Sequence, residues 1–228
     1  MKRLLITGGT GFVGKNIIPS LLDSGFICRC IIHNTPLPLN LKEHPLIEIE
    51  KADITKYSTL KKLFIKVDAV IHMAAAIDSV NETVHNQINI VGTENIVRAA
   101  KENNVKRIIF FSGYPAGLKK NKGIYGETKA KAENIIINSG LSYTIFRIGV
   151  LYGKYDRRNL SKLLLLACKL PFIIILGNGR NIIQPLYCSD LVQPLIFALN
   201  NSISYNKLYI LGGIKPLTFE NFIDDFIK

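Results

Sequence analysis

The chain has 228 residues, of which 48% are hydrophobic and 20% are charged. This composition supports one large folded domain, or one domain with a small appendage, and excludes global disorder. The formal net charge is +12, but the lysines are scattered along predicted helices. We find no zinc spacing, recognition helix or RNA-binding aromatic motif. We therefore expect solvated helix faces and no nucleic-acid partner, and DNA binding driven by charge is the weaker hypothesis.

The cysteines and the longest apolar run indicate in which cellular compartment the protein works. The four cysteines, at positions 28, 30, 168 and 188, form no C-x-x-C pair and have no histidine at metal-ligand spacing. We expect reduced thiols, no metal site and a cytoplasmic protein with no signal peptide. The most apolar stretch, 163–176, is too short to span a bilayer, and Lys169 and Pro171 interrupt it. It predicts a helix end, a turn and a strand rather than contact with a membrane.

Strand-like and helix-like segments alternate along the chain. Short runs that are apolar on both faces predict strands of a parallel sheet covered on both sides, at Lys2–Thr7, Phe26–Ile32, Leu46–Lys51, Ala69–His72, Arg107–Phe111 and Tyr143–Arg147. Helical periodicity appears at Gly11–Ser24, Ser58–Ile65, Val80–Asn103 and Tyr125–Ser139. This alternation predicts an α/β fold with a Rossmann-like, doubly wound parallel sheet.

The pattern loosens after Arg147, where glycines become frequent. Further helices are predicted at Leu160–Leu170 and Ser189–Leu199, and strands at Phe172–Leu176 and Lys207–Leu211. Ser189 and Asp190 have the character of a helix N-cap, and Thr218 begins a terminal helix. We expect a core at 1–150 and a smaller lobe at 151–228, with segments of the lobe that return to the core.

A glycine-rich turn follows the first predicted strand. Residues 7–14 read T-G-G-T-G-F-V-G, with glycines at 8, 11 and 14. Gly8 permits the tight turn, Gly11 leaves room for a diphosphate at the backbone, and Gly14 lets the helix lie close to the sheet. The free N–H groups at the helix N-terminus favour phosphate. The pattern predicts a dinucleotide site.

Tyr125 and Lys129 lie four residues apart on a predicted helix and therefore share one face. For a tyrosine to work near neutral pH, its pKa must fall from about 10 to about 7, which costs about 4 kcal/mol. One ammonium at about 4 Å supplies roughly that energy at an intermediate dielectric. Tyr125 could then act as a general acid or base during hydride transfer, and Lys129 could also hold the nicotinamide ribose. The alternative is a surface pair on a solvated helix.

The end of the second predicted strand bears on the choice of cofactor. Sites that prefer NAD often carry an acidic residue there, which binds the adenosine ribose. Here the strand ends in Ile31-Ile32-His33-Asn34, without a carboxylate. The absence of an acidic residue here favours NADP as the cofactor, or acceptance of both NAD and NADP.

Further motifs occur in a fixed order: A-D-I at 52–54, H-M-A-A-A at 72–76, N-I-V-G-T at 89–93, Y-G-E-T-K-A-K-A-E at 125–133 and F-R-I-G-V-L-Y-G at 146–153. With the glycine turn, they resemble the extended or atypical short-chain dehydrogenase/reductases of the NAD-dependent epimerase/dehydratase group. The resemblance covers most of the chain. It implies an NAD(P)-dependent oxidoreductase, epimerase or dehydratase that acts on a sugar-like substrate, including nucleotide sugars, or on another hydroxylated small molecule.

The patterns and the resemblance together define candidate residues. The catalytic candidates are Tyr125, Lys129 and Ser112. The cofactor-binding candidates are Gly8, Thr10, Gly11, Phe12, Val13, Gly14, His33, Asp53, Ile54, Ala74, Ala75, Ala76, Asn89 and Lys129. The resemblance also implies that Asp53 contacts the adenine ring, and that the two long helices can form a homodimer. It further implies that 1–150 is an NAD(P)-binding core and that 151–228 is a small, truncated substrate-binding lobe.

One departure from the family pattern concerns catalysis. Members usually end the fifth strand with two hydroxyl residues, the second of which binds the reacting oxygen, but here Gly113 takes that place after Ser112. Either Ser112 or Tyr114 could substitute. A cofactor-binding protein without catalysis, such as a redox sensor or an accessory subunit, is therefore the alternative hypothesis.

Overall fold

The computed structural model describes residues 1–156, 160–161, 164–165 and 179–227. Within them, parallel strands form a seven-stranded sheet in the order β10-β6-β5-β4-β1-β2-β3. The strands are β1 (Arg3–Thr7), β2 (Ile27–Ile32), β3 (Ile47–Lys51), β4 (Ala69–His72), β5 (Arg107–Gly113), β6 (Ser142–Ile148) and β10 (Lys207–Leu211). The predicted strands that form this sheet are confirmed to within one residue at each end, except that β5 runs two residues further than expected.

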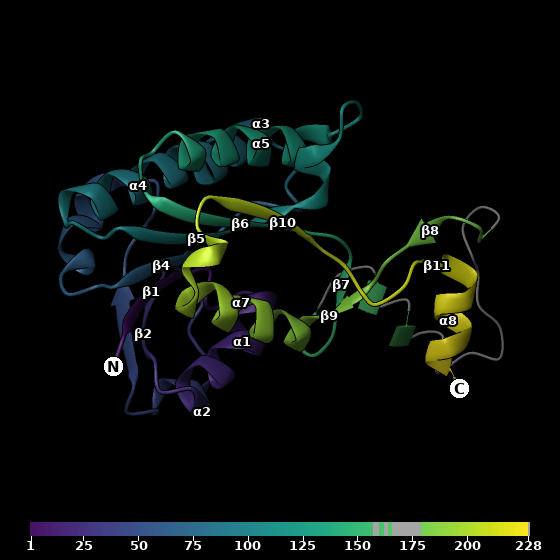
Figure 1. Cartoon of the computed structure of the whole chain (residues 1–228), viewed down its shortest axis with the longest axis horizontal. Coiled ribbons are helices and arrows are strands. Elements are labelled where there is room, and N and C mark those ends of the chain that lie inside the picture. Colours follow the sequence, from purple (N-terminus) through teal and green to yellow (C-terminus); the bar gives the residue numbers. More distant parts are fainter. Residues whose placement is uncertain (157–159, 162–163, 166–178, 228) are drawn as a thin grey trace.

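Helices cover both faces of this sheet (Figure 1). One face carries α1 (Phe12–Asp23) and α7 (Val192–Asn200), and the other carries α4 (Gly92–Glu102) and α5 (Gly123–Ile137). Two separate clusters of buried apolar side chains fill the spaces between the sheet and each helical layer. The protein therefore has the predicted Rossmann-like, doubly wound α/β fold.

The segment predicted as one helix at Ser58–Ile65 is instead two 3₁₀ turns, η1 (Tyr57–Thr59) and η2 (Lys61–Phe64). Leu60 and Phe64 are fully buried there and explain the helical spacing of apolar residues. Two tight 3₁₀ turns are enough to bury both side chains in this short connector. Burying two side chains does not require the hydrogen bonds of an α-helix.

The long helix predicted at Val80–Asn103 is interrupted. It consists of α3 (Glu82–His85), a π-helical segment η3 (Asn86–Val91) and then α4. Asn89 is buried inside the π-helical segment, and its side chain bonds to the backbone of Ala76. The wider π turn accompanies this inward-facing amide, as often occurs near functional sites.

A smaller lobe lies beside the core (Figure 1, right). It contains the strand pair β8 (Ile182–Ile183) with β11 (Leu217–Thr218), followed by α8 (Phe219–Ile227). Its own apolar cluster includes Leu164, Phe222 and Ile223. The pair β7 (Leu151–Tyr152) and β9 (Leu186–Tyr187) lies between the lobe and the core. β10 joins the edge of the main sheet, and the buried side of α7 belongs to one of the two core clusters.

Of the two helix starts predicted in this region, one is confirmed and one is wrong. Thr218 caps α8, because its hydroxyl accepts a hydrogen bond from Asn221 N at 3.1 Å. Ser189 and Asp190 do not cap α7; they lie in a 3₁₀ turn, η5 (Cys188–Leu191), that precedes it. The predicted strand at Phe172–Leu176, most of the predicted helix at Leu160–Leu170, and Cys168 lie outside the described residues.

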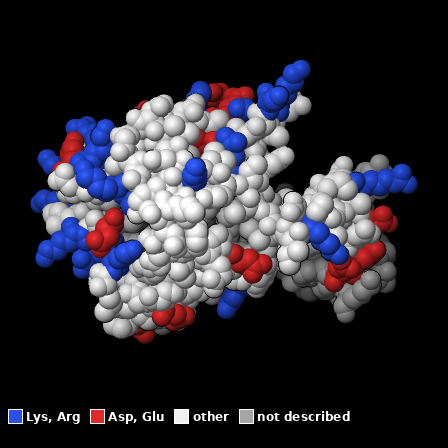
Figure 2. Space-filling view, in the orientation of Figure 1, with Lys and Arg blue, Asp and Glu red and all other residues white. Residues whose placement is uncertain are grey.

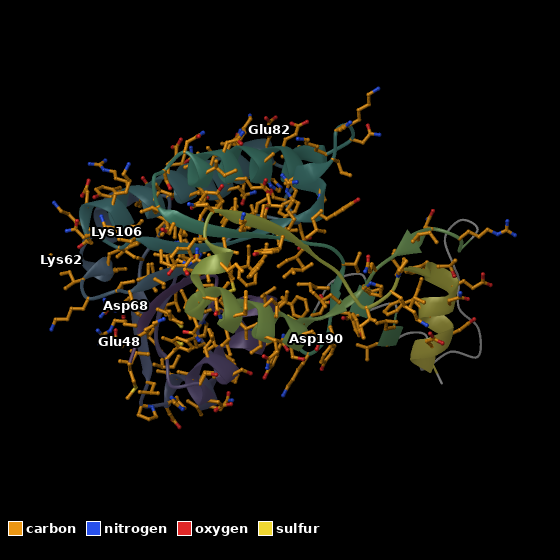
Figure 3. The ribbon with its side chains drawn as sticks, viewed as in Figure 1. Glu48, Lys62, Asp68, Glu82, Lys106 and Asp190 are labelled. Atoms are coloured by element: carbon orange, nitrogen blue, oxygen red, sulfur yellow. The ribbon has the colours of Figure 1, made fainter. Side chains whose placement is uncertain are left out.

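Charged side chains of both signs are spread over the visible surface (Figure 2). Lys62, Lys106, Glu48 and Asp68 lie together at the end of the core remote from the lobe (Figure 3). Lys106 and Asp68 immediately precede β5 and β4, so this is the N-terminal end of the strands. In the part of the chain that the structure describes, no helix has the length and apolar character to cross a membrane.

Candidate cofactor and active site

A cleft of about 530 Å³ opens at the C-terminal ends of the parallel strands. It lies where β1 has β4 on one side and β2 on the other, so that the chain connections run in opposite directions across the sheet. Ligands of doubly wound sheets bind at this kind of crevice. The volume is within the usual range of ligand pockets.

The glycine turn between β1 and α1 forms one wall of the cleft. Gly8 has a φ of +75°, and a Cβ there would lie 2.6 Å from Ala74 N. A Cβ at Gly14 would lie 2.5 Å from the backbone of Gly9, so helix and turn pack in direct contact. Gly11 is the N-cap of α1, and no side chain caps the helix there. Its first N–H groups are therefore suited to bind a diphosphate.

A buried hydrogen-bond chain ties the ends of β1 and β4 together. Thr7 Oγ1 accepts hydrogen bonds from the N–H groups of Met73 (3.2 Å) and Ala74 (3.1 Å). Its own hydrogen must therefore go to His72 Nδ1, 2.6 Å away. His72 then carries its proton on Nε2 and donates it to Thr93 Oγ1 at 3.0 Å. This relay joins the turn, β4 and α4 into one rigid unit beneath the cleft.

Asn89 holds the segment that follows β4. Its side chain accepts a hydrogen bond from Ala76 N at 2.8 Å and donates to Ala76 O at 3.1 Å. It also donates to Thr128 Oγ1 on α5 at 2.9 Å. Because its polar atoms bond to protein groups, Asn89 acts on the cleft by positioning the 74–76 segment and α5.

Tyr125, on α5, reaches the cleft at the end of β5. A Cβ added at Gly113 would lie 2.6 Å from Tyr125 Cε1 and 2.8 Å from its hydroxyl oxygen. The phenol therefore lies directly on the bare backbone of Gly113. Ser112 also lines the cleft, and its buried hydroxyl has no hydrogen-bond partner in the described structure. Tyr114 is 49% exposed and does not line the cleft.

Lys129 lies one helical turn from Tyr125 and is only 1% exposed. Its ammonium lies 3.8 Å from the centre of the Phe110 ring. Burial lowers the pKa of Lys129 to about 7, although the charge of Glu133 acts in the opposite direction. Burial, and secondly the charge of Lys129, lower the pKa of His72 to about 3. Burial therefore weakens, near neutral pH, the ammonium charge that the sequence predicted beside Tyr125.

An ion pair anchors the same helix to the sheet. Arg147, at the end of β6, contacts the carboxylate of Glu133 through two nitrogens, with Nη2 2.7 Å from Oε2 and Nε 3.0 Å from Oε1. Glu133 is buried, and a two-point contact of this kind restricts orientation as well as distance. The pair thus joins α5, the helix that carries Tyr125, to the end of β6.

His33 and Asp53 meet at the other end of the cleft, beyond β2 and β3. His33 Nε2 lies 3.9 Å from Asp53 Oδ2. Asp53 Oδ1 accepts hydrogen bonds from Thr55 N (2.9 Å) and Thr55 Oγ1 (2.7 Å). Burial alone would raise the pKa of Asp53, but the Thr55 hydrogen bonds and the nearby positive charges outweigh it and hold that pKa below its usual value.

A family model for the "NAD dependent epimerase/dehydratase family" matches residues 4–212, which include the whole glycine turn, Tyr125 and β10. The chain belongs to this family. Membership gives a nicotinamide dinucleotide as the cofactor and places the chain among NAD-dependent enzymes of the extended short-chain dehydrogenase/reductase type. The uncapped start of α1 and the place of Gly11 in the cleft wall fit such a cofactor.

Curated relatives in this family have different activities. The chain is 26% identical to a UDP-glucose 4-epimerase of Vibrio cholerae, over 92% of this chain and 70% of that protein. It is 24% identical to a 3β-hydroxysteroid dehydrogenase/Δ5→4-isomerase of Mycobacterium tuberculosis, over 96% of this chain and 67% of that protein. It is also 26% identical to the photosystem II assembly factor Ycf39 of Trieres chinensis, over 93% of this chain and 64% of that protein.

Solved structures of epimerase/dehydratase type share the fold. MoeE5 in complex with UDP-glucuronic acid and NAD superposes with a TM-score of 0.86 at 19% identity, covering 98% of this chain and 81% of that one. The Bordetella bronchiseptica enzyme WbmH in complex with NAD⁺ gives a TM-score of 0.82 at 22% identity, covering 98% of this chain and 79% of that one.

Most of the residues predicted for this epimerase/dehydratase site come together in one cleft. Those that line it are Gly8, Thr10, Gly11, Phe12, Val13, His33, Asp53, Ile54, Ala74, Ala75, Ser112 and Tyr125. Gly14, Ala76, Asn89 and Lys129 do not line it and lie behind its walls. Lys129 in particular is covered by the protein in this structure, so its predicted contact with the cofactor ribose stays a prediction.

Sequence reasoning did not name several other residues of the cleft wall. They are Thr7, Ile31, Ala52, Thr55, Met73, Ile77, Ile88, Phe111, Ile148, Gly149 and Leu151. Most of them lie at or just beyond the C-terminal ends of predicted strands. That position was a usable signal, because strand ends form the ligand edge of a doubly wound sheet.

Proposed function

We propose that this protein catalyses NAD(P)-dependent oxidation or reduction at a hydroxyl or carbonyl carbon of a sugar-like substrate, with Tyr125 as the general acid or base. The observation that supports this most is the position of Tyr125. Its phenol lines the same cleft as the glycine turn, so it can exchange a proton with a substrate oxygen beside the cofactor. When bound, the nicotinamide supplies the hydride chemistry.

Ser112 has a second role in this proposal. Its buried hydroxyl lacks a partner in the described structure, which is costly unless a ligand satisfies it. A substrate oxygen bound between Ser112 and Tyr125 would do so. Ser112 would thereby orient the reacting oxygen in place of the hydroxyl that Gly113 lacks.

The substrate class is inferred from a second cavity, of about 290 Å³, on the side of the smaller lobe. Its lining includes Tyr152, Tyr187, Asp190, Lys215 and Asp225. The two tyrosine rings lie 5.4 Å apart, and carboxylates accept hydrogen bonds from hydroxyl groups. Aromatic faces beside carboxylates favour a hydroxylated ring. Tyr152 follows Leu151 of the main cleft, so a single substrate could reach both cavities.

The test compares Tyr125→Phe with the matched control Tyr114→Phe, which changes a tyrosine outside the cleft. Binding of NAD⁺ and NADP⁺ is measured by calorimetry, and turnover is screened with UDP-hexoses and free sugars. We expect Tyr125→Phe to keep cofactor affinity within about twofold and to lose about 10²-fold or more in turnover. We expect Tyr114→Phe to behave as the wild type. Equal turnover in both variants would remove Tyr125 from the acid/base role.

A second candidate function is cofactor binding without turnover. Gly113 favours this second function, because it has no side chain at the position where members of the family usually carry a hydroxyl group. Tight binding of a pyridine nucleotide, with no turnover of any substrate and no effect of Tyr125→Phe, would select this function over the first.

A further inference from the structure

The smaller cavity, on the side of the lobe, is lined by three aromatic rings. Tyr152 of β7, Tyr187 of β9 and Phe222 of α8 all contribute to its wall. The rings of Tyr152 and Tyr187 lie 5.4 Å apart at an angle of 57°, and those of Tyr152 and Phe222 lie 5.4 Å apart at 72°. Rings inclined in this way do not form a flat stack, so they can enclose a ligand from more than one direction.

The charge of this cavity is opposite in sign to that of the whole chain. Of the described residues that line it, Asp190 and Asp225 carry negative charges and Lys215 carries a positive one. Two negative charges thus face one positive charge, in a chain whose formal net charge is +12. Figure 3 shows Asp190 where the core meets the lobe.

The protein's own cations do not occupy the tyrosine rings or Asp190. Among the described residues, no lysine or arginine lies over the ring of Tyr152 or Tyr187. Within the same part of the chain, Asp190 forms no ion pair, and Lys215 is exposed and makes neither kind of contact. Tyr187 is 42% exposed, so a ligand from solution can reach its ring.

The same surroundings disfavour additional negative charge. Burial raises the pKa of the Tyr152 phenol, and the neighbouring Asp190 and Tyr187 raise it further. A phosphate group in the cavity would meet the same repulsion. An ammonium group instead is attracted both by an aromatic face within about 6 Å and by a carboxylate. A neutral hydroxyl group gains only the hydrogen bond to the carboxylate.

We propose that this cavity binds an ammonium group, and that the substrate is therefore an amino-substituted sugar or a similar hydroxylated amine. The amino group would lie remote from the reacting carbon, because Tyr152 lines the smaller cavity and the preceding residue, Leu151, lines the main cleft. The inference rests on the proposed function, since it requires one substrate to extend from this cavity to Tyr125.

The experiment uses pairs of probes that differ in charge and little in shape. Choline is compared with 3,3-dimethylbutan-1-ol, in which a carbon atom replaces the quaternary nitrogen, and glucosamine is compared with glucose. Dissociation constants are measured by NMR titration of the full chain, for the wild type, Asp190→Asn and Tyr187→Leu. Asp224→Asn is the matched control, because Asp224 is an exposed carboxylate of α8 that does not line the cavity. Thermal denaturation shows whether each variant is folded.

We expect the wild type to bind choline about tenfold more tightly than its neutral analogue, and to prefer glucosamine to glucose, as for an ammonium held by an aromatic face beside a carboxylate. Asp190→Asn and Tyr187→Leu should each reduce this preference by about threefold or more, and Asp224→Asn should keep it. Equal binding of the charged and neutral probes by the wild type would overturn the inference. A preference that survives both substitutions in folded protein would also overturn it.

Turnover separates this inference from the proposed function. If both hold, amino sugars should be turned over with a higher kcat/KM than the matching neutral sugars, and Tyr125→Phe should abolish that turnover without changing choline binding. Turnover of neutral sugars with no preference for amines would overturn this inference alone. Selective choline binding, with no turnover of any sugar and no effect of Tyr125→Phe, would overturn the proposed function and with it the assignment of the amine as a substrate.

Discussion

Gly113 and Tyr125 are in direct contact: a Cβ on Gly113 would lie 2.6 Å from Tyr125 Cε1. Carbon atoms do not approach so closely, so the phenol in its present position requires glycine at 113. The missing hydroxyl and the position of the proposed acid/base are therefore one structural feature. Any side chain at 113 must move the ring of Tyr125.

The first prediction concerns this contact. Gly113→Ala should destabilise the protein by about 1–3 kcal/mol, because the added methyl overpacks the site. Tyr125→Ala removes the ring and should relieve the clash. In a double-mutant cycle measured by urea denaturation, the double variant should therefore be more stable than the sum of the single effects predicts, by about 1 kcal/mol or more. Additive effects would mean that the two residues do not constrain each other.

The second prediction concerns the glycine turn. Gly8 and Gly140 have similar φ values, +75° and +79°, but a Cβ at Gly8 would meet Ala74 N at 2.6 Å, whereas a Cβ at Gly140 meets nothing within 4 Å. Alanine at Gly140 should cost only backbone strain, about 1 kcal/mol. Alanine at Gly8 should cost more and also weaken nucleotide binding at least tenfold.

Calorimetry and thermal denaturation of both alanine variants check this. Comparable losses of stability in the two proteins, with unchanged nucleotide affinity in Gly8→Ala, would contradict the role of close packing against residue 74.

The third prediction concerns pH and Lys129, whose pKa burial lowers from 10.5 to about 7. Between these values the unfolded chain binds the proton more tightly, so the contribution of Lys129 to stability is complete above about pH 10.5 and is lost as the pH falls toward 7. From pH 7.0 to 8.5, the free energy of unfolding should rise by about 1.5 kcal/mol more in the wild type than in Lys129→Met.

Urea denaturation across that pH range measures the difference. The comparison stops at pH 8.5, because cysteines in the unfolded chain begin to ionise near that pH. Burial raises the pKa of the thiols of Cys28, Cys30 and Cys188, so they stay protonated in the folded state and the fold loses stability as the pH rises further. Parallel curves for the two proteins would show that Lys129 keeps its full charge in the folded state.

The fourth prediction concerns the ion pair that anchors α5. Glu133→Gln leaves Arg147 without its two-point partner and should lower stability by about 2 kcal/mol, a value reduced from the fully buried case because Arg147 is partly exposed. Its effect on turnover should appear mainly in kcat, since Tyr125 would lose its position. Glu102→Gln, which breaks the exposed pair with Arg98, is the matched control and should change little.

Stability and kinetic measurements on both variants separate the two pairs. A Glu133→Gln protein as stable and as active as Glu102→Gln would show that the buried pair does not set the geometry of the site.

Much of the core could be predicted from local sequence. β1 and β4 are buried on both faces, so their residues form continuous apolar runs that end where the sheet ends. The glycines at 11 and 14 are likewise a local requirement, because a Cβ at either position would meet backbone of the same turn, at Gly8 and Gly9. These features depend on few distant contacts, which is why a single sequence reveals them.

The irregular helices could not be predicted in the same way. Apolar spacing reports which face of a helix is buried, not which hydrogen-bond register the backbone adopts. At 86–91 the π-helical turn accompanies the bond between Asn89 and Ala76, which lies thirteen residues earlier in the chain. At 57–64 the burial of Leu60 and Phe64 is satisfied by two 3₁₀ turns.

The sequence by itself determined the doubly wound sheet, the phosphate-binding turn and the shared helix face of Tyr125 and Lys129, because each follows from periodicity or spacing within one segment. Only the tertiary structure decided that Lys129 is buried and has a lowered pKa, that Tyr125 occupies the space beside Gly113, and that His33 faces Asp53. Those properties depend on contacts between strands and helices remote in sequence, and on how far each group is removed from water.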